Sequence, residues 1–159
     1  MEAIEETKMS NATSHVRGQK QIKVFLSYAY ADLVSARRIR NLLFHQLGLQ
    51  VFLHEDLSAG ENWRPKLRKE LEHADVFVAL LTPTSVTDSW LLQETGAAWA
   101  LEKPIVPIVT RRDVLNNFPM ALDPHAMIEI NYLDRLEDPK SADKFVRAFE
   151  GTLAVSNVF

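Results

Sequence analysis

Residues 76–82, VFVALLT, constrain the fold more than any other segment of this 159-residue chain. The run is apolar at every position but the last, without the alternation of a strand that has one face in water. A strand of this kind is typical of the centre of a parallel sheet. We therefore expect a sheet whose two faces are both covered by helices.

Strand-like and helix-like patterns alternate about five times along the chain. The expected strands are 22–27, 49–53, 76–82, 104–110 and 127–132, and the expected helices are 31–48, 64–75, 89–103 and a last one with its apolar stripe over 142–153. Segment 111–126 is the least regular. The alternation predicts the α/β class: a flavodoxin-like, doubly wound, five-stranded parallel sheet of order 2-1-3-4-5 with helices on both faces.

Length and composition indicate one domain, 21–159, after a polar, flexible N-terminal tail, 1–20. The net charge of −3 argues against nucleic acid as a partner. No apolar run approaches the ~20 residues that span a membrane, and the N-terminus lacks a signal sequence, so a cytoplasmic location is expected. Cysteine is absent and the histidines lack metal-ligand spacing, so no metal site is expected.

A sheet of order 2-1-3-4-5 commonly binds its ligand at the carboxyl ends of strands 1 and 3. Those ends read SYAY (27–30) and TPTSVTDSW (82–90), which makes Ser27, Tyr28, Ser89 and Trp90 candidate binding residues. None of the five glycines follows strand 1, so a dinucleotide loop of the dehydrogenase type is excluded. The acidic residues that a phosphoacceptor receiver domain needs are also missing.

Glu94 is the only charge in SWLLQETGAAWAL (89–101), an otherwise apolar helix. Helical spacing places it close to one stripe with Trp90, Ala97, Ala98 and Leu101, about one turn from the expected crevice. A carboxylate in such surroundings is costly unless something pairs with it or uses it. Two interpretations remain open: a structural carboxylate that reaches solvent or an arginine, or a catalytic one.

Three segments, in order and at suitable spacing, resemble the boxes of the TIR (Toll/interleukin receptor) domain. VFLSYAYAD is similar to the first box, and LQVFLHEDLSAGENWRPKLRKELEHAD resembles the second strand, the BB loop and the next helix, with Gly60 and Trp63 in the expected places. VFVALLTPTSVTDSWLLQETGAAWALEKPIVPIV resembles the third box. The resemblance covers about 22–154, and Leu91-Leu92 after the tryptophan points towards a prokaryotic type.

The resemblance implies an enzyme that cleaves NAD+ as its substrate, without a further cofactor, to ADP-ribose or a cyclic isomer. Glu94 matches the family's catalytic glutamate. Trp90 would wall the nicotinamide-ribose pocket, Ser27, Tyr28 and Ser89 would contact the substrate, and Gly60 would give mobility to the loop 55–62. Core packing is an equal alternative for Trp90 and Tyr28, and a plain surface connection for the loop.

The resemblance also implies self-association through TIR surfaces that include the 55–62 loop. A small TIR protein of this kind is expected to make an antiphage immune signal for a separate effector protein. Two other functions remain open, a non-enzymatic adaptor and a virulence mimic that acts through TIR–TIR association. Glu94 after Ser-Trp favours the enzyme, because adaptors frequently lack that glutamate.

Overall fold

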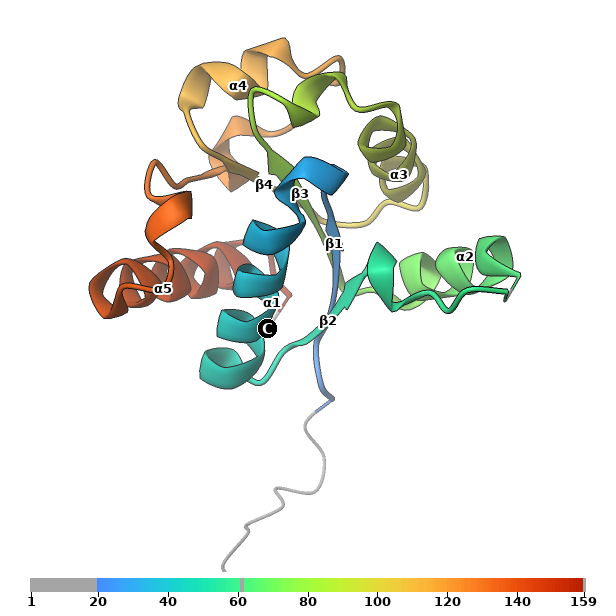
Figure 1. Cartoon of the computed structure of the whole chain (residues 1–159), viewed down its shortest axis with the longest axis horizontal. Coiled ribbons are helices and arrows are strands. Elements are labelled where there is room, and N and C mark those ends of the chain that lie inside the picture. Colours follow the sequence, from blue (N-terminus) through green and yellow to red (C-terminus); the bar gives the residue numbers. More distant parts are fainter. Residues whose placement is uncertain (1–19, 61, 159) are drawn as a thin grey trace, which may run out of the picture.

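The computed structural model describes residues 20–60 and 62–158, which form a helix–sheet–helix arrangement (Figure 1). Five parallel strands are ordered β2-β1-β3-β4-β5, which confirms the predicted topology. They are β1 (Lys23–Ser27), β2 (Gln50–Leu53), β3 (Val76–Leu81), β4 (Ile105–Val109) and β5 (Ile128–Glu129). The winding reverses at β1, so the chain covers both faces of the sheet.

Helices α1 (Leu33–Leu47) and α5 (Pro139–Val155) cover one face of the sheet. Helices α2 (Trp63–His73), α3 (Ser89–Ala100) and the short α4 (Arg112–Asn117) cover the other (Figure 1). Each face has its own apolar core, which explains why the central strands are apolar on both sides.

The pleat of the central strands decides which side chains face which layer. In β1, Val24 and Leu26 pack with the α1–α5 core, whereas Phe25 packs with the α2–α3 core. Ser27, two residues after Phe25, therefore faces the same layer as α3, beside Ala79 of β3. All six residues of β3 are buried, as the run VFVALL predicts.

Two regions differ from the expected element bounds. β5 has two residues rather than six, although Ile130 N still donates to Val109 O at 2.8 Å before the chain turns. Segment 111–126 contains α4 and a 3-10 turn (Pro124–Ala126), held by the buried Val114 and Phe118. Only two of the six residues of α4 are apolar, which is too few for a periodic pattern, so this helix could not be predicted from the sequence.

The predicted tail, 1–20, lies outside the described residues except for Lys20, whose Nζ contacts Asp75 Oδ1 at 2.7 Å. Over residues 20–60 and 62–158, no helix is long and apolar enough to cross a membrane. The same residues contain no group of three or more His, Cys, Asp or Glu side chains that could hold a metal ion.

Candidate functional site

Glu94 lies in the second turn of α3, and its side chain is directed away from water. The residue is 5% exposed, and its Oε1 accepts a hydrogen bond from Ser27 Oγ at 2.8 Å. Its second oxygen, Oε2, is buried and has no partner at hydrogen-bond geometry within the described part of the chain, although the indole N–H of Trp90, which is also unpaired, lies close enough to lower the pKa of the carboxyl. Buried polar atoms are normally satisfied by protein or ordered water, so this carboxylate oxygen is free to accept a hydrogen bond from a water or a ligand.

The sequence of α3 explains how Glu94 comes to this position. Asp88 caps the helix by accepting from Leu91 N at 2.8 Å, and Leu91, Thr95 and Ala98 are buried towards the sheet. Glu94 lies at the edge of that buried face, next to β1. The helix is less enclosed than its composition indicates, because Trp99 is 68% exposed on the far side.

Burial raises the pKa of Glu94 from 4.5 to about 7. Desolvation is the main cause, since it disfavours the charged form. The hydrogen bond from Ser27 opposes the rise, the nearby charge of Asp88 adds to it, and the indole N–H of Trp90 opposes it to a smaller extent. Glu94 is thus poised to change protonation near neutral pH, a property common at functional sites.

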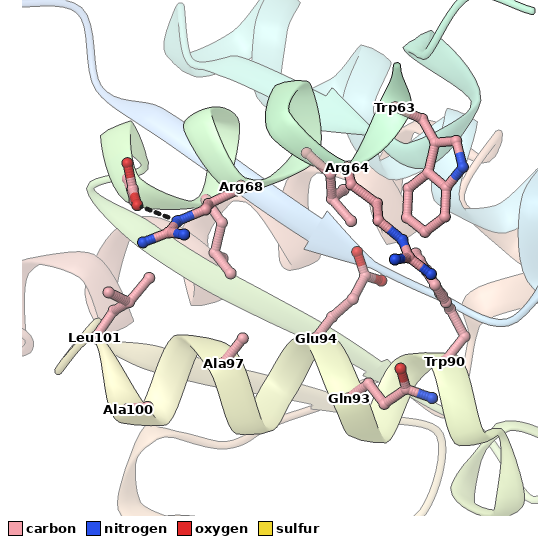
Figure 2. A pocket seen from close by; sticks show the side chains of 12 residues that line it. Trp63, Arg64, Arg68, Trp90, Gln93, Glu94, Ala97, Ala100 and Leu101 are labelled. Atoms are coloured by element: carbon pink, nitrogen blue, oxygen red, sulfur yellow. Dashed lines mark hydrogen bonds and ion pairs between the residues drawn. The ribbon is translucent and has the colours of Figure 1, made fainter. Parts of the chain in front are cut away.

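Glu94 opens into a cavity of about 530 Å³ between α2 and α3, here named the α2–α3 groove (Figure 2). Its lining comes from both helices: Trp63, Arg64, Leu67, Arg68, Leu71, Glu72, Trp90, Gln93, Glu94, Ala97, Ala100 and Leu101. The expected stripe of Trp90, Glu94, Ala97 and Leu101 faces this groove, whereas Ala98 is in the core.

A second cavity of about 420 Å³, the loop cavity, adjoins the first. It is lined by His54, Glu55, Leu57, Ser58, Ala59, Gly60, Trp63 and Trp90. Trp63 and Trp90 line both cavities, with ring centroids 5.4 Å apart at a 60° angle, and His54 packs edge-on against Trp90 at 4.9 Å. An aromatic wall of these three rings therefore separates the two cavities beside Glu94.

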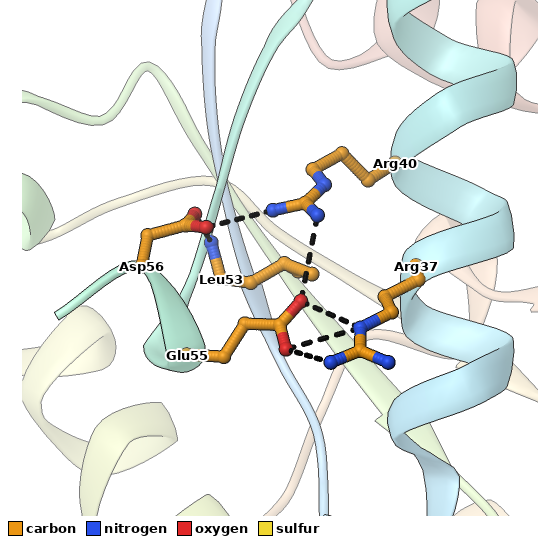
Figure 3. A network of polar contacts seen from close by, with 5 residues as sticks. All are labelled: Arg37, Arg40, Leu53, Glu55 and Asp56. Atoms are coloured by element: carbon orange, nitrogen blue, oxygen red, sulfur yellow. Dashed lines mark hydrogen bonds and ion pairs between the residues drawn. The ribbon is translucent and has the colours of Figure 1, made fainter.

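The first residues of the 55–62 loop are held against α1 by a network of charged groups (Figure 3). Arg37 donates to both carboxylate oxygens of Glu55, and Arg40 Nη1 contacts Asp56 Oδ1 at 2.8 Å. The Arg37 guanidinium lowers the pKa of Glu55. The loop is thus fixed at its start, and the tip at Ser58, Ala59 and Gly60 is exposed.

The structure brings together three of the six predicted site residues: Ser27, Trp90 and Glu94. Gly60 lines the loop cavity on the other side of the aromatic wall, with a φ of +86°. Tyr28 is buried with the α1–α5 core, and burial raises its pKa. Ser89 is exposed in the first turn of α3 and lines neither cavity.

The α2–α3 groove is lined by α2 and α3, whereas the predicted crevice lies between segments 27–30 and 82–90, of which only Trp90 lines the groove. At the carboxyl ends of the strands, Thr82 Oγ1 donates to Asp32 Oδ2 at 2.9 Å, which joins the segments after β1 and β3. Sequence analysis missed His54 and Arg64 as lining residues. Neither residue belongs to a sequence motif. Each lines a cavity only because α2 and the loop pack against α3.

Comparison with known families and structures agrees with this architecture. A sequence profile of the TIR domain matches residues 24–149. No curated protein matches the chain.

Two solved structures share the fold. The TIR domains of the activated Roq1 resistosome, which recognises the pathogen effector XopQ, match with a TM-score of 0.53 and 18% identity over 87% of this chain and 86% of theirs. A metazoan TIR-STING receptor from C. gigas, in complex with 2′,3′-cGAMP, matches with a TM-score of 0.56 and 20% identity; the match covers 79% of this chain and 38% of the receptor.

Proposed function

Because the chain belongs to the TIR domain family, some members of which cleave NAD+, we propose that it is an NAD+ nucleosidase or ADP-ribosyl cyclase. Glu94 is its catalytic carboxylate in this proposal. The observation that carries the proposal is a buried glutamate with one unpaired oxygen, next to an indole and open to a cavity large enough for a nucleotide.

The chemistry needs only one carboxylate. The bond between ribose C1′ and nicotinamide N1 breaks, and its electron pair leaves with the nicotinamide, which departs neutral because the ring was a cation. No general acid is required, unlike in ordinary glycosidases, which use two carboxyl groups. Water then adds to C1′ and loses a proton to solvent to give ADP-ribose, or an adenine or ribose group of the same molecule adds to C1′ and likewise loses a proton to solvent to give a cyclic isomer.

Glu94 suits the role of stabilising the oxocarbenium-like transition state. Its Oε2 is unpaired, and the hydrogen bond from Ser27 fixes the other oxygen and the rotamer. A negative charge on a buried side chain such as Glu94 stabilises developing positive charge more strongly than it would in bulk water. Ser27 acts here as a positioning residue.

The aromatic wall suits the nicotinamide end of the substrate. Trp90 stands one helical turn before Glu94, with His54 and Trp63 against it. The indole face attracts a pyridinium cation, so Trp90 is the wall of the nicotinamide-ribose pocket in this proposal. The tip of the 55–62 loop then closes over the nicotinamide from the side of the loop cavity.

The proposal includes self-association and an immune role. A neighbour's 55–62 loop would complete the site, and the product would act as a signal for a separate effector. The alternative function is a non-enzymatic adaptor or virulence mimic, in which the same TIR surfaces only recruit partners.

Incubation of the purified protein with NAD+, followed by chromatography and mass analysis, tests the proposal. We expect nicotinamide together with ADP-ribose or a cyclic isomer. Glu94→Gln should lower turnover by orders of magnitude, because the lost interaction is made in the transition state. The adaptor function predicts no cleavage by either form. Cleavage that falls only in proportion to the folded fraction would make Glu94 structural.

A further inference from the structure

Arg64 stands out among the cations that line the α2–α3 groove, because no carboxylate of the described chain pairs with it. Its guanidinium carbon lies 5.3 Å from the centroid of the Trp63 ring, and its side chain extends from α2 towards α3 (Figure 2). Arg68, one turn further along α2, donates to Glu72 at 2.7 Å and is thereby compensated. Arg64 is therefore the groove arginine available for an anion.

The two cavities beside Glu94 differ in charge. Among the described residues that line the loop cavity there is no lysine or arginine, and the one carboxylate, Glu55, is paired with Arg37. The groove is lined by Arg64, by the Arg68–Glu72 ion pair and by Glu94, so Arg64 is its one cation without a carboxylate partner among the described residues. A substrate with a sugar at Glu94 and phosphates on one side of it would therefore place the phosphates in the groove.

We propose that Arg64 binds the pyrophosphate of the dinucleotide, and that the distal nucleoside lies further along the groove. The inference rests on the proposed function, since it takes the reacting ribose to be at Glu94. The guanidinium of the exposed Arg64 lies over the Trp63 ring, a contact that favours this position and leaves its N–H donors free for two phosphate oxygens. Such a contact would set both the direction in which the substrate lies and the preference for phosphorylated ligands.

The groove beyond Arg64 suits an adenosine. From Glu94 to Leu101 α3 advances by seven residues, about 10 Å. The floor over this length is apolar, with Leu67 and Leu71 from α2 and Ala97 and Leu101 from α3. A flat base can pack there with most of its surface removed from water.

The test is the equilibrium binding of ADP-ribose and of adenosine, measured by isothermal titration calorimetry. This measurement does not depend on turnover. Arg64→Gln should weaken ADP-ribose binding by about tenfold and leave adenosine binding unchanged, because only the former carries the phosphates. Arg64→Lys should restore part of the loss. The matched control is Arg147→Gln. Arg147 lies on α5, which covers the other face of the sheet, and is paired with Asp143, so this change should alter the binding of neither ligand.

A second variant tests the nucleoside position. Ala97 is exposed and lines the groove, so the larger side chain of Ala97→Leu would extend into the groove rather than into the core. This variant should bind both ADP-ribose and adenosine more weakly. Three results would overturn the proposal. The first is that the wild type fails to bind ADP-ribose, the second that the Kd of Arg64→Gln for ADP-ribose lies within twofold of the wild-type value, and the third that Arg64→Gln weakens the binding of adenosine as much as that of ADP-ribose. NAD+ cleavage is measured separately. If the protein does not cleave NAD+ but binds ADP-ribose in a way that depends on Arg64, the proposed function is wrong and the phosphate site stands.

Discussion

At the residue scale, Glu94 couples the stability of the fold to pH. Its pKa is about 7 in the folded chain against an ordinary value of 4.5, because burial disfavours the charged form. Between these two pH values the folded protein keeps a proton that the unfolded chain has released. The free energy of unfolding therefore falls as pH rises through this window, by up to about 3 kcal/mol, and changes no further above it.

Glu94→Gln should remove this dependence. The amide oxygen can still accept from Ser27, and no charge has to be buried. We expect the variant to melt close to the wild type at pH 5 and to be more stable at pH 8 by about 1–3 kcal/mol. Thermal unfolding followed by circular dichroism at both pH values checks this.

Glu150→Gln, which changes an exposed glutamate of α5, is the control for Glu94→Gln and should show no such difference. Equal destabilisation by Glu94→Gln at both pH values would contradict the linkage. It would show that the carboxylate stabilises the fold.

At the element scale, the 55–62 loop consists of an anchored start and an exposed tip. Arg37 and Arg40 hold Glu55 and Asp56 against α1, so the loop leaves β2 in a defined direction. Gly60, at the tip, has a φ of +86°, a conformation that costs other residues about 1 kcal/mol or more. The glycine thereby sets the shape of the tip that lines the loop cavity.

Gly60→Ala should disturb the tip without disturbing the core. No atom lies within 4 Å of the added Cβ, so the loop can relieve the strain by changing its own conformation. We expect NAD+ cleavage to fall several-fold and the melting temperature to move by no more than about 2 °C. Steady-state assays and thermal unfolding measure the two effects.

The matched control for Gly60→Ala is Gly151→Ala in α5, where the new Cβ also meets nothing within 4 Å and φ is not positive. That change should stabilise the helix by about 0.5–1 kcal/mol and leave cleavage unchanged. Undiminished cleavage by Gly60→Ala would mean that the tip takes no part in the reaction.

At the scale of the whole molecule, the site is open to the surface, and large aromatic side chains are exposed elsewhere on the molecule. The α2–α3 groove and the loop cavity both open outwards, and Trp99 of α3 is 68% exposed. Tyr30, which follows β1, is 86% exposed. Aromatic residues are enriched in the cores of protein–protein interfaces, so Trp99 and Tyr30 are candidates to contact a neighbouring copy.

Self-association should therefore raise activity. We expect NAD+ cleavage per milligram to increase with protein concentration, because a neighbouring copy would cover the open side of the site and exclude water from it. Activity measured over a hundredfold range of concentration, together with sedimentation velocity, checks this. A protein that stays monomeric while its rate rises strictly in proportion to concentration would refute the prediction.

The covering of the sheet on both faces could be predicted from sequence because it depends on periodicity, and the strand order could be predicted because 2-1-3-4-5 is common among doubly wound sheets. A fully apolar run such as 76–82 has few places in a fold other than a central strand, and alternating strand and helix leaves few topologies. The stripe of Trp90, Glu94, Ala97 and Leu101 follows from helical spacing alone. The short α4 and the early end of β5 have no such pattern, since each is held by only a few buried residues.

Only the tertiary structure decided what surrounds Glu94. The hydrogen bond from Ser27 Oγ to Glu94 Oε1 depends on the pleat of β1 and on the placement of α3 beside it. Together they bring these two atoms to 2.8 Å, although the residues are 67 positions apart in the sequence. His54, Trp63 and Arg64 join the site because the 55–62 loop and α2 pack next to α3, a contact that no local pattern encodes. Burial by these neighbours raises the pKa of Glu94, and burial is a property of the assembled layers rather than of any one segment.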